Sequence, residues 1–163
     1  MENALPTSDA VAATGAPDQT VNQLNSLLRG EISAAETYRM AIDKIVASPN
    51  SENVGLLREI QEEHGRAAQG IRDRIQELGG EASDTSGAWG VWAKTVQGTM
   101  NLLGDASSLK ALKEGEEHGL KDYQEALDDV DASSAQLIQN QFIPAQQRHI
   151  NLLDQLLSAV GKA

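Results

Sequence analysis

Four long stretches of the chain repeat apolar residues at the spacing of an α-helix, and no other feature limits the possible folds as strongly. Leucine, isoleucine, valine and alanine recur three or four positions apart within residues 20–45, 57–78, 109–130 and 133–160. Each stripe predicts an amphipathic helix with one buried face. The connection between the second and third stretches is long and the other two are short, as in two antiparallel hairpins joined by a crossover. The sequence therefore predicts an all-α four-helix bundle.

The expected bundle is preceded by a segment of different composition. Residues 1–19 are biased toward Ala, Thr, Ser, Pro and Gly, carry no Lys or Arg, and contain no long apolar run. This composition predicts a flexible tail rather than a secretory signal. Thr20 and Gln23 have the spacing of a capping box, so we expect the first helix to begin at Thr20. The predicted domains are therefore a tail, residues 1–19, and one bundle, residues 20–163.

Three further local signals bear on the helices. Gly79 follows the second helical stretch, and glycine tolerates the left-handed conformation that ends many helices. The last helix begins either at Asp131 or at Ser133, which opens a second capping-box pattern. Pro144 lies inside this last helix and lacks the amide hydrogen that a continuous helix needs. We therefore expect a bend there, which either wraps the helix around the bundle or aims the residues that follow into the core.

The long connection, residues 87–105, is itself partly apolar. It carries Trp89, Trp92, Val96 and Met100 at helical spacing. We expect a short helix there, packed across the bundle. Two interpretations are open: a lid over one end of the core, or a contact between copies in a homo-oligomer.

The composition excludes several kinds of site and partner. The 163 residues contain no cysteine, which excludes disulfides, thiolate metal ligands and cysteine nucleophiles. The net charge of −11 argues against nucleic acids and anionic membrane surfaces, because both attract basic patches. There is no apolar run of roughly 18 residues, the length that predicts a membrane span. We therefore expect no nucleic acid and no membrane as partners, whereas an acidic chain can still attract metal cations. A cytoplasmic location is the default expectation.

A shift of 85 residues aligns the two halves of the chain without a gap. The segment GEISAAETYRMAID, residues 30–43, falls on GEEHGLKDYQEALD, residues 115–128, and QEEHGRAAQGI falls on QQRHINLLDQL. A shared amphipathic pattern explains matching leucines, but it does not explain matching Gly, Glu, Gln, His and Tyr. We interpret the match as an ancient duplication of one helix hairpin, with chance similarity between amphipathic helices as the alternative.

A rotation of about 100° per residue decides which polar side chains face the core. On this basis Glu31 lies in the middle of the apolar stripe of the first helix, and Glu116 lies in the same place on the third. The neighbouring Glu117 and His118 are conspicuous in the sequence but point away from the stripe. We predict that this pair is solvated surface.

Histidines take the corresponding central position on the other two helices. His64 and His149 face the core, and each follows a glutamine by three residues, Gln61 and Gln146. Buried ionisable groups are costly unless they are paired or bind a metal. Every helix of the bundle thus contributes an inward polar group at one level, which predicts a site in the core.

These residues resemble the ferritin-like superfamily of di-iron and di-manganese carboxylate bundles. More narrowly, GEISAAETY, LGGEASDTSGAWG, GEEHGLKDY and IPAQQRHINLLD look like an uncharacterised bacterial branch of it, known as a domain of unknown function. The resemblance runs from about Thr20 to Val160 and implies a ferritin-like four-helix bundle. The family pattern is a Glu on one helix and Glu-x-x-His on its hairpin partner, repeated once. The metal ligands that it implies are Glu31, His64, Glu116 and His149.

The chain departs from the family pattern at Gln61 and Gln146, where the family has the glutamates that bridge two metals. A neutral amide binds a metal more weakly than a carboxylate does. Both glutamines are therefore expected either to be weak ligands or to contact the ligands without binding the metal. The resemblance also implies that Tyr38 and Tyr123 lie next to the ligands without binding the metal, as hydrogen-bond or electron donors. The glutamines argue against a di-iron centre and favour a mononuclear site, or two separate weak ones. Iron is the first candidate metal, with manganese or zinc as alternatives.

Two functions remain compatible with these residues. One is a metal-binding protein that handles metal or oxidative stress, and it leaves open whether the protein is an enzyme. The other is a non-enzymatic bundle whose ancestral site has become a metal-free hydrogen-bond network, acting as a structural or stress-related assembly protein. The two glutamines favour the second function, and the Glu, His and Tyr residues found in both halves favour the first.

Overall fold

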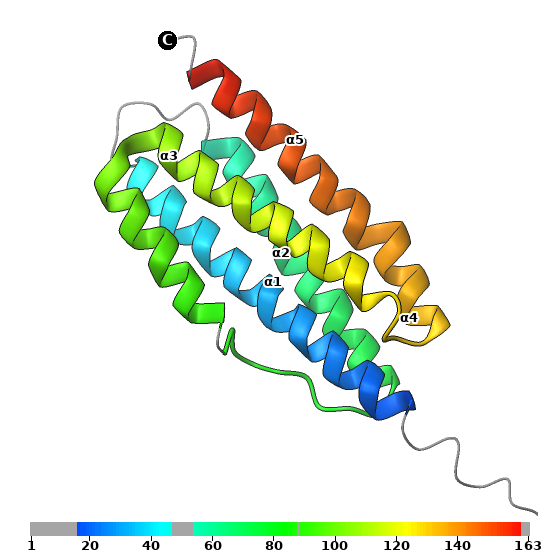
Figure 1. The fold of residues 1–163 in the computed structure, drawn as a ribbon. Coiled ribbons are helices and arrows are strands. Elements are labelled where there is room, and N and C mark those ends of the chain that lie inside the picture. Colours follow the sequence, from blue (N-terminus) through cyan, green and yellow to red (C-terminus); the bar gives the residue numbers. More distant parts are fainter. Residues whose placement is uncertain (1–15, 47–53, 88, 161–163) are drawn as a thin grey trace, which may run out of the picture.

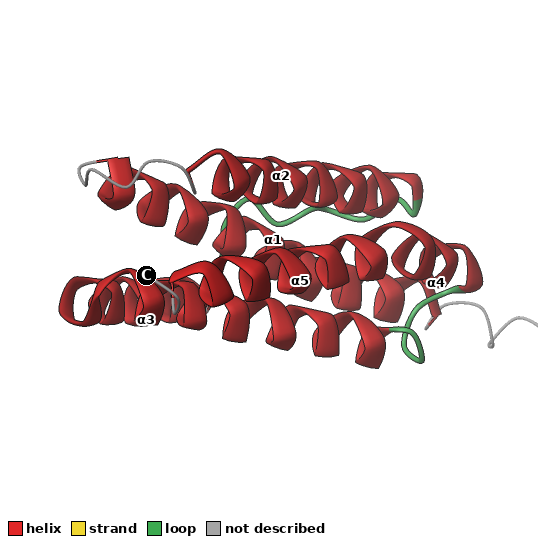
Figure 2. Cartoon of the chain, turned by 90° about the horizontal axis from the view of Figure 1, so that it is seen from above, coloured by secondary structure: helices red, strands yellow, loops and turns green. Residues whose placement is uncertain are grey.

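The structure, a computed structural model, describes residues 16–46, 54–87 and 89–160, and the side chains of these except for residues 16, 44–46 and 89–105. All regular structure in this part of the chain is helical (Figure 2). None of its helices is long and apolar enough to cross a membrane. The elements are α1 (Ala16–Val46), α2 (Val54–Glu77), α3 (Trp89–Ala126), α4 (Ala132–Leu137), the π-helix η2 (Ile138–Phe142) and α5 (Ile143–Val160).

The helices form a four-helix bundle, as the sequence predicts (Figure 1). The first hairpin consists of α1 packed against α2, and the second consists of α3 packed against α5. The two hairpins meet mainly along α1 and α3, whereas α2 and α5 make few contacts with each other.

The crossover helix expected in the long connection is not a separate element. Helical structure is continuous from Trp89 to Ala126, so the crossover forms the first part of α3. Figure 1 shows this part, in green, running beside the bundle and turning into the yellow part that packs within it. The side chains of residues 89–105 lie outside the described ones, so the lid and the oligomer contact both stay predictions.

α1 begins earlier than the capping box predicts. Its first residue is Ala16, and Thr20 is buried inside the helix. The hydroxyl of Thr20 accepts a hydrogen bond of 3.0 Å from the backbone amide of Asp131. The expected cap is therefore wrong, because Thr20 bonds the start of a distant helix, and no pattern within one segment reports such a contact. Residues 1–15 of the predicted tail lie outside the described residues.

Two other predicted helix ends agree with the structure. Gly79 has a left-handed φ of 74° just after α2, and its amide donates to the carbonyl of Gln76. Of the two starts considered for the last helix, the structure has Asp131. Its carboxylate accepts hydrogen bonds from the backbone amides of the first turn, including that of Ser133.

The bend expected at Pro144 takes the form of a π-helical segment. Residues Ile138–Phe142 are wound as a π-helix, in which the amide of Ile143 donates to the carbonyl of Ile138. Pro144 cannot donate the next bond, so the wider winding occurs where the helix has to omit a hydrogen bond. Beyond this point α5 carries Gln146 and His149 into the core.

Two apolar clusters fill the bundle, and the inward polar residues lie between them in every helix. One cluster is built around Ile42, Leu57, Ile60, Leu112 and Leu153. The other is built around Leu24, Leu28, Ile71, Ile75 and Ile138. Tyr38 belongs to the first cluster and Tyr123 to the second, so their hydroxyl groups reach the polar level from opposite ends.

Candidate metal centre

A layer of buried polar side chains separates the two apolar clusters. α1 contributes Glu31, α2 contributes His64, α3 contributes Glu116 and α5 contributes His149. Each of these residues is at most 6% exposed. The structure therefore brings together the four residues whose helical phase points them into the core.

Glu116 is the centre of this layer, because its two oxygens have partners on all three other main helices. Oε1 accepts a hydrogen bond of 2.5 Å from the Tyr38 hydroxyl and lies 3.0 Å from His64 Nε2. Oε2 accepts a bond of 2.5 Å from the Gln146 amide and lies 3.2 Å from His149 Nδ1. Burial alone would raise the pKa of Glu116, but the charge of His64 and the histidine hydrogen bonds outweigh it and lower the pKa to about 2. Glu116 is therefore ionised at neutral pH.

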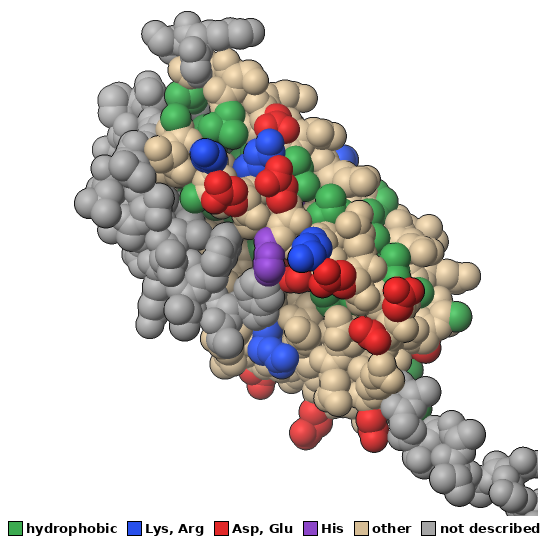
Figure 3. Space-filling view, in the orientation of Figure 1, with side chains coloured by type: hydrophobic (Ala, Val, Ile, Leu, Met, Phe, Trp, Pro, Cys, Tyr) green, Lys and Arg blue, Asp and Glu red, His purple; other side chains and the backbone are tan. Residues whose placement is uncertain are grey.

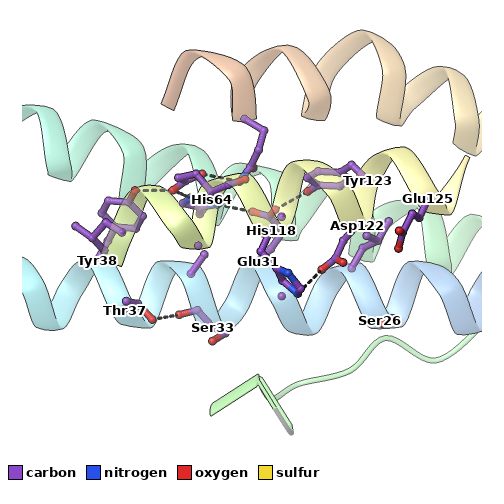
Figure 4. A pocket seen from close by; sticks show the side chains of 18 of the residues that line it. Ser26, Glu31, Ser33, Thr37, Tyr38, His64, His118, Asp122, Tyr123 and Glu125 are labelled. Atoms are coloured by element: carbon purple, nitrogen blue, oxygen red, sulfur yellow. Dashed lines mark hydrogen bonds and ion pairs between the residues drawn. The ribbon is translucent and has the colours of Figure 1, made fainter. Parts of the chain in front are cut away.

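Glu31 holds the equivalent position in the first half. Its Oε1 accepts a bond of 2.5 Å from the Tyr123 hydroxyl, and its Oε2 lies 2.7 Å from His64 Nδ1. The two tyrosines are thus exchanged between the halves, because Tyr38 of α1 bonds Glu116 of α3 and Tyr123 of α3 bonds Glu31 of α1 (Figure 4). Burial, reinforced by the adjacent carboxylate, raises the pKa of each tyrosine well above its usual value. Both tyrosines stay protonated and hold the carboxylates in place.

His64 lies between the two carboxylates. Burial would lower its pKa, but the charges of Glu116 and Glu31 outweigh burial and raise the pKa well above the usual value. In the absence of a metal, His64 is therefore an imidazolium at neutral pH and donates both ring N–H groups. Two negative carboxylates then surround one positive ring, so these three residues carry a net negative charge that a cation can neutralise.

Glu63 is a partner of His149 that helical phase did not predict. Glu63 Oε2 lies 2.8 Å from His149 Nε2 and accepts a bond of 3.0 Å from Arg148. Partial burial would raise the pKa of Glu63, but the His149 hydrogen bond and the Arg148 charge outweigh it and lower the pKa. An ionised Glu63 holds a hydrogen on Nε2 of His149, so Nδ1 faces Glu116. The sequence holds a signal for the Glu63–Arg148 contact. The 85-residue shift relates these two positions, and their side chains carry opposite charges.

The two glutamines that replace the family's glutamates differ in their surroundings. Gln146 is buried, and its amide nitrogen donates both to the Glu116 carboxylate and to the Glu116 carbonyl. A Cβ at Gly119 would lie 2.7 Å from this nitrogen, so the glycine makes room for the amide. Gln61 is only half-buried and, within the described part of the chain, stands outside the hydrogen-bonded layer. Neither glutamine acts as an acceptor in the layer.

Glu117 and His118 lie at the surface, as the sequence predicts. Each side chain is 53% exposed. His118 Nε2 lies 3.6 Å from Asp122 Oδ2, and Figure 3 shows acidic side chains beside the exposed histidine. The adjacent Glu-His pair in the sequence is therefore not the site.

Three buried residues of the layer present the donor atoms of a metal site. One ligand atom from each of His64, Glu116 and His149 lies within 4.8 Å of the other two. Ligand atoms bound about 2.1 Å from one metal ion lie roughly 3 to 4 Å apart, so small side-chain shifts would bring these atoms into coordination. Two imidazoles and one carboxylate are the donor set of mononuclear non-haem iron(II) centres in proteins.

We predict that the metal-free protein is most stable between the ordinary pKa values of glutamate and histidine, 4.5 and 6.5. The stabilisation from Glu116, roughly 3 kcal/mol, is complete above pH 4.5 and is lost as the pH falls toward the folded-state pKa of about 2. The stabilisation from His64 is complete below pH 6.5 and is lost as the pH rises through its raised pKa. Urea unfolding with a chelator present, at about pH 3, 5.5 and 8.5, should give its highest midpoint at pH 5.5.

A His118→Gln variant serves as the control for this profile, because His118 is exposed. Its stability should vary with pH as that of the unchanged chain does. A midpoint that stays constant from about pH 5.5 to 8.5 would contradict the imidazolium state of His64.

Residues 19–129 match the model of a family described as a domain of unknown function, DUF2383. The chain belongs to this family. The match covers α1 from Gln19 onward, α2 and α3, and hence Glu31, His64 and Glu116 of the DUF2383 chain. No curated protein matches it in sequence at a significant level.

Solved structures place the DUF2383 chain in a wider fold group. Bacterioferritin of Rhodobacter capsulatus superposes with a TM-score of 0.73 and 21% identity, over 89% of this chain and 87% of that one. That protein was solved with a metal-free dinuclear site and haem iron. A ferritin-like, diiron-carboxylate protein of Bacillus anthracis strain Ames gives a TM-score of 0.62 and 18% identity, over 86% of this chain and 96% of its own. The likeness establishes the fold, so the predicted ferritin-like four-helix bundle is confirmed.

Proposed function

We propose that the protein binds one transition-metal dication per chain through His64, Glu116 and His149, and that it handles metal or oxidative stress. The observation that carries this proposal is the convergence of three buried donor atoms from three helices within 4.8 Å. The two structural neighbours are a bacterioferritin with a dinuclear site and a ferritin-like, diiron-carboxylate protein, which supports a metal site in a bundle of this fold.

The charges of the layer fit a single dication. Glu31 and Glu116 are the two carboxylates buried in it. A dication that takes the place of the proton on His64 Nε2 balances these two negative charges, and this exchange makes binding pH-dependent. Two dications would leave two positive charges in excess inside the core, which is costly.

The residues around the three donors orient them as ligands. Glu31 accepts the Nδ1 hydrogen of His64 and thereby turns Nε2 toward Glu116. Glu63 accepts the Nε2 hydrogen of His149 and thereby turns Nδ1 toward Glu116. Such partners fix the tautomer of a ligating histidine and raise its basicity. Glu31, predicted from the family pattern to be a ligand, is better placed in this arrangement to orient His64.

The donor set favours iron(II), with manganese and zinc as alternatives. Two imidazoles and one carboxylate leave coordination positions of the ion open to an exogenous ligand. Gln146 does not fit a di-iron centre, because it directs its amide nitrogen, not its oxygen, at Glu116.

The direct test is a metal titration of the full-length, chelator-treated chain. Cobalt(II), whose absorption reports coordination, should bind once per chain, and iron should be found in protein purified without chelator. A His149→Ala variant should bind cobalt(II) more than about 100-fold more weakly. His118→Ala is the matched control, because it removes an exposed histidine, and should leave binding unchanged. If iron, manganese, zinc and cobalt all fail to bind the unchanged chain, the proposal is wrong.

A metal-free assembly protein is the second candidate function. It is supported by one observation: in the described part of the chain, no buried side-chain nitrogen or oxygen lacks a hydrogen-bond partner. A layer that is complete without an ion can serve as a structural network in which Glu31 and Glu116 pair with the histidines. Thermal unfolding separates the two candidates, because a metal that binds the folded state raises the melting temperature with concentration.

A further inference from the structure

A cavity of about 140 Å³ opens between α1 and α3, on the side of the bundle where the two hairpins meet (Figure 4). The buried Glu31 and Glu116 line it, and so do Leu27 of one apolar cluster and Leu112 of the other. An engineered cavity of about 150 Å³ in another protein binds benzene, so this one can hold a molecule of similar size.

Both halves of the repeat contribute equivalent residues to this cavity. The 85-residue shift relates Gly30 to Gly115 and Ala34 to Gly119, and all four line it. A Cβ added to Gly30 would meet no atom within 4 Å, so close packing does not account for this glycine. Glycine inside a helix costs roughly 1 kcal/mol relative to alanine. At Gly30 the missing side chain leaves space that the cavity occupies.

Carboxylates predominate around the cavity, although the imidazolium of His64 also lines it and His118 lies there 3.6 Å from Asp122. Asp122 and Glu125 line it in addition to Glu31 and Glu116, and none of its described lining residues is lysine or arginine. The equivalents of His118 and Asp122 in the first half are Ser33 and Thr37, so the acidic group at position 122 is specific to the second half. An anion would meet repulsion in this cavity, and a cation would meet attraction.

We propose that this cavity binds a small organic cation, an amine of about the size of benzene, with its ammonium group at Asp122 and its apolar part against Leu27. The apolar wall accounts for a hydrocarbon portion, and the surrounding carboxylates account for the positive charge. The inference does not depend on the proposed metal, because these residues are in place in the chain itself.

The test compares three probes of similar size and different charge: cyclopentylamine, which is protonated at neutral pH, cyclopentanol and cyclopropanecarboxylate. Each is titrated into the isotope-labelled full-length chain, with and without chelator, and binding is followed by NMR shifts of residues lining the cavity. The amine should bind about tenfold more tightly than the alcohol, and the carboxylate should not bind. Asp122→Asn should remove most of the advantage of the amine over the alcohol.

A Gly30→Leu variant places a side chain in the cavity, starting from a Cβ that meets no atom within 4 Å, so it should lose binding of both the amine and the alcohol. Gly65→Leu is the matched control, because Gly65 is an exposed glycine of α2 that also has no atom within 4 Å of an added Cβ. It should bind the amine like the unchanged chain. Equal binding of all three probes, no binding of any, or amine binding that survives in Gly30→Leu would overturn the proposal. Because the probes are titrated with chelator present, these outcomes are distinct from a failure to bind metal.

Discussion

Replacing Glu116 with glutamine is expected to destabilise the metal-free protein by about 3 to 5 kcal/mol and to abolish measurable metal binding. The carboxylate accepts hydrogen bonds from three donors and faces Nδ1 of His149, and an amide would replace one of its two oxygens with a further donor. Tyr38 and His64 lie on one oxygen, and Gln146 and His149 lie on the other. Either orientation of the amide therefore sets donors against donors, and buried groups left without an acceptor are costly.

The loss of charge adds to the loss of hydrogen bonds. His64 is held as an imidazolium by Glu116 and Glu31, and removing one of these carboxylates leaves its charge only partly compensated inside the core. The same substitution removes the only carboxylate among the three proposed ligands. Urea unfolding with a chelator measures the first effect, and a cobalt(II) titration measures the second.

Glu117→Gln is the matched control for this experiment. Glu117 is the next residue along the same helix, but its side chain is 53% exposed and lies 3.5 Å from Lys113. Surface ion pairs of this kind contribute about 0 to 1 kcal/mol, so the control should lose little stability and no metal affinity. Equal effects of the two substitutions would show that Glu116 has no special position.

Helical phase alone was sufficient to find the central residues of the layer. Glu31 and Glu116 could be placed in the core because each lies in the middle of an apolar stripe, and the direction of a side chain on a helix follows from its position in the chain. The same reasoning placed Glu117 and His118 at the surface. These predictions need no knowledge of how the helices are packed, and the structure agrees with them.

Contacts between helices could not be predicted in the same way. The exchange of the two tyrosines depends on how far α1 and α3 are shifted along each other, and the phase of a single helix does not contain that shift. Glu63 lies beside the stripe, so its bond to His149 depends on which helix packs there. Thr20 was misassigned for the same reason, since its partner Asp131 is 111 residues away in the chain.

The two glutamines limit the negative charge that the layer can offer to metal ions. Replacing both Gln61 and Gln146 with glutamate is expected to change the stoichiometry from one bound metal per chain to two. Together with Glu31 and Glu116, the new carboxylates supply four negative charges, which balance two dications. Metal analysis after a titration with iron(II) or cobalt(II) counts the bound ions.

The same double variant should be less stable than the unchanged chain when no metal is present, by about 3 kcal/mol or more at neutral pH. The Gln146 nitrogen lies 2.5 Å from a Glu116 oxygen, so a glutamate there would set one carboxylate against another in a buried position. Metal should restore the lost stability, because dications bridge carboxylates that otherwise repel. Gln147→Glu is the control: it adds one carboxylate at an exposed position next to Gln146 and should change neither stability nor stoichiometry. A double variant that still binds a single metal would mean that the glutamines are not what limits this bundle to one ion.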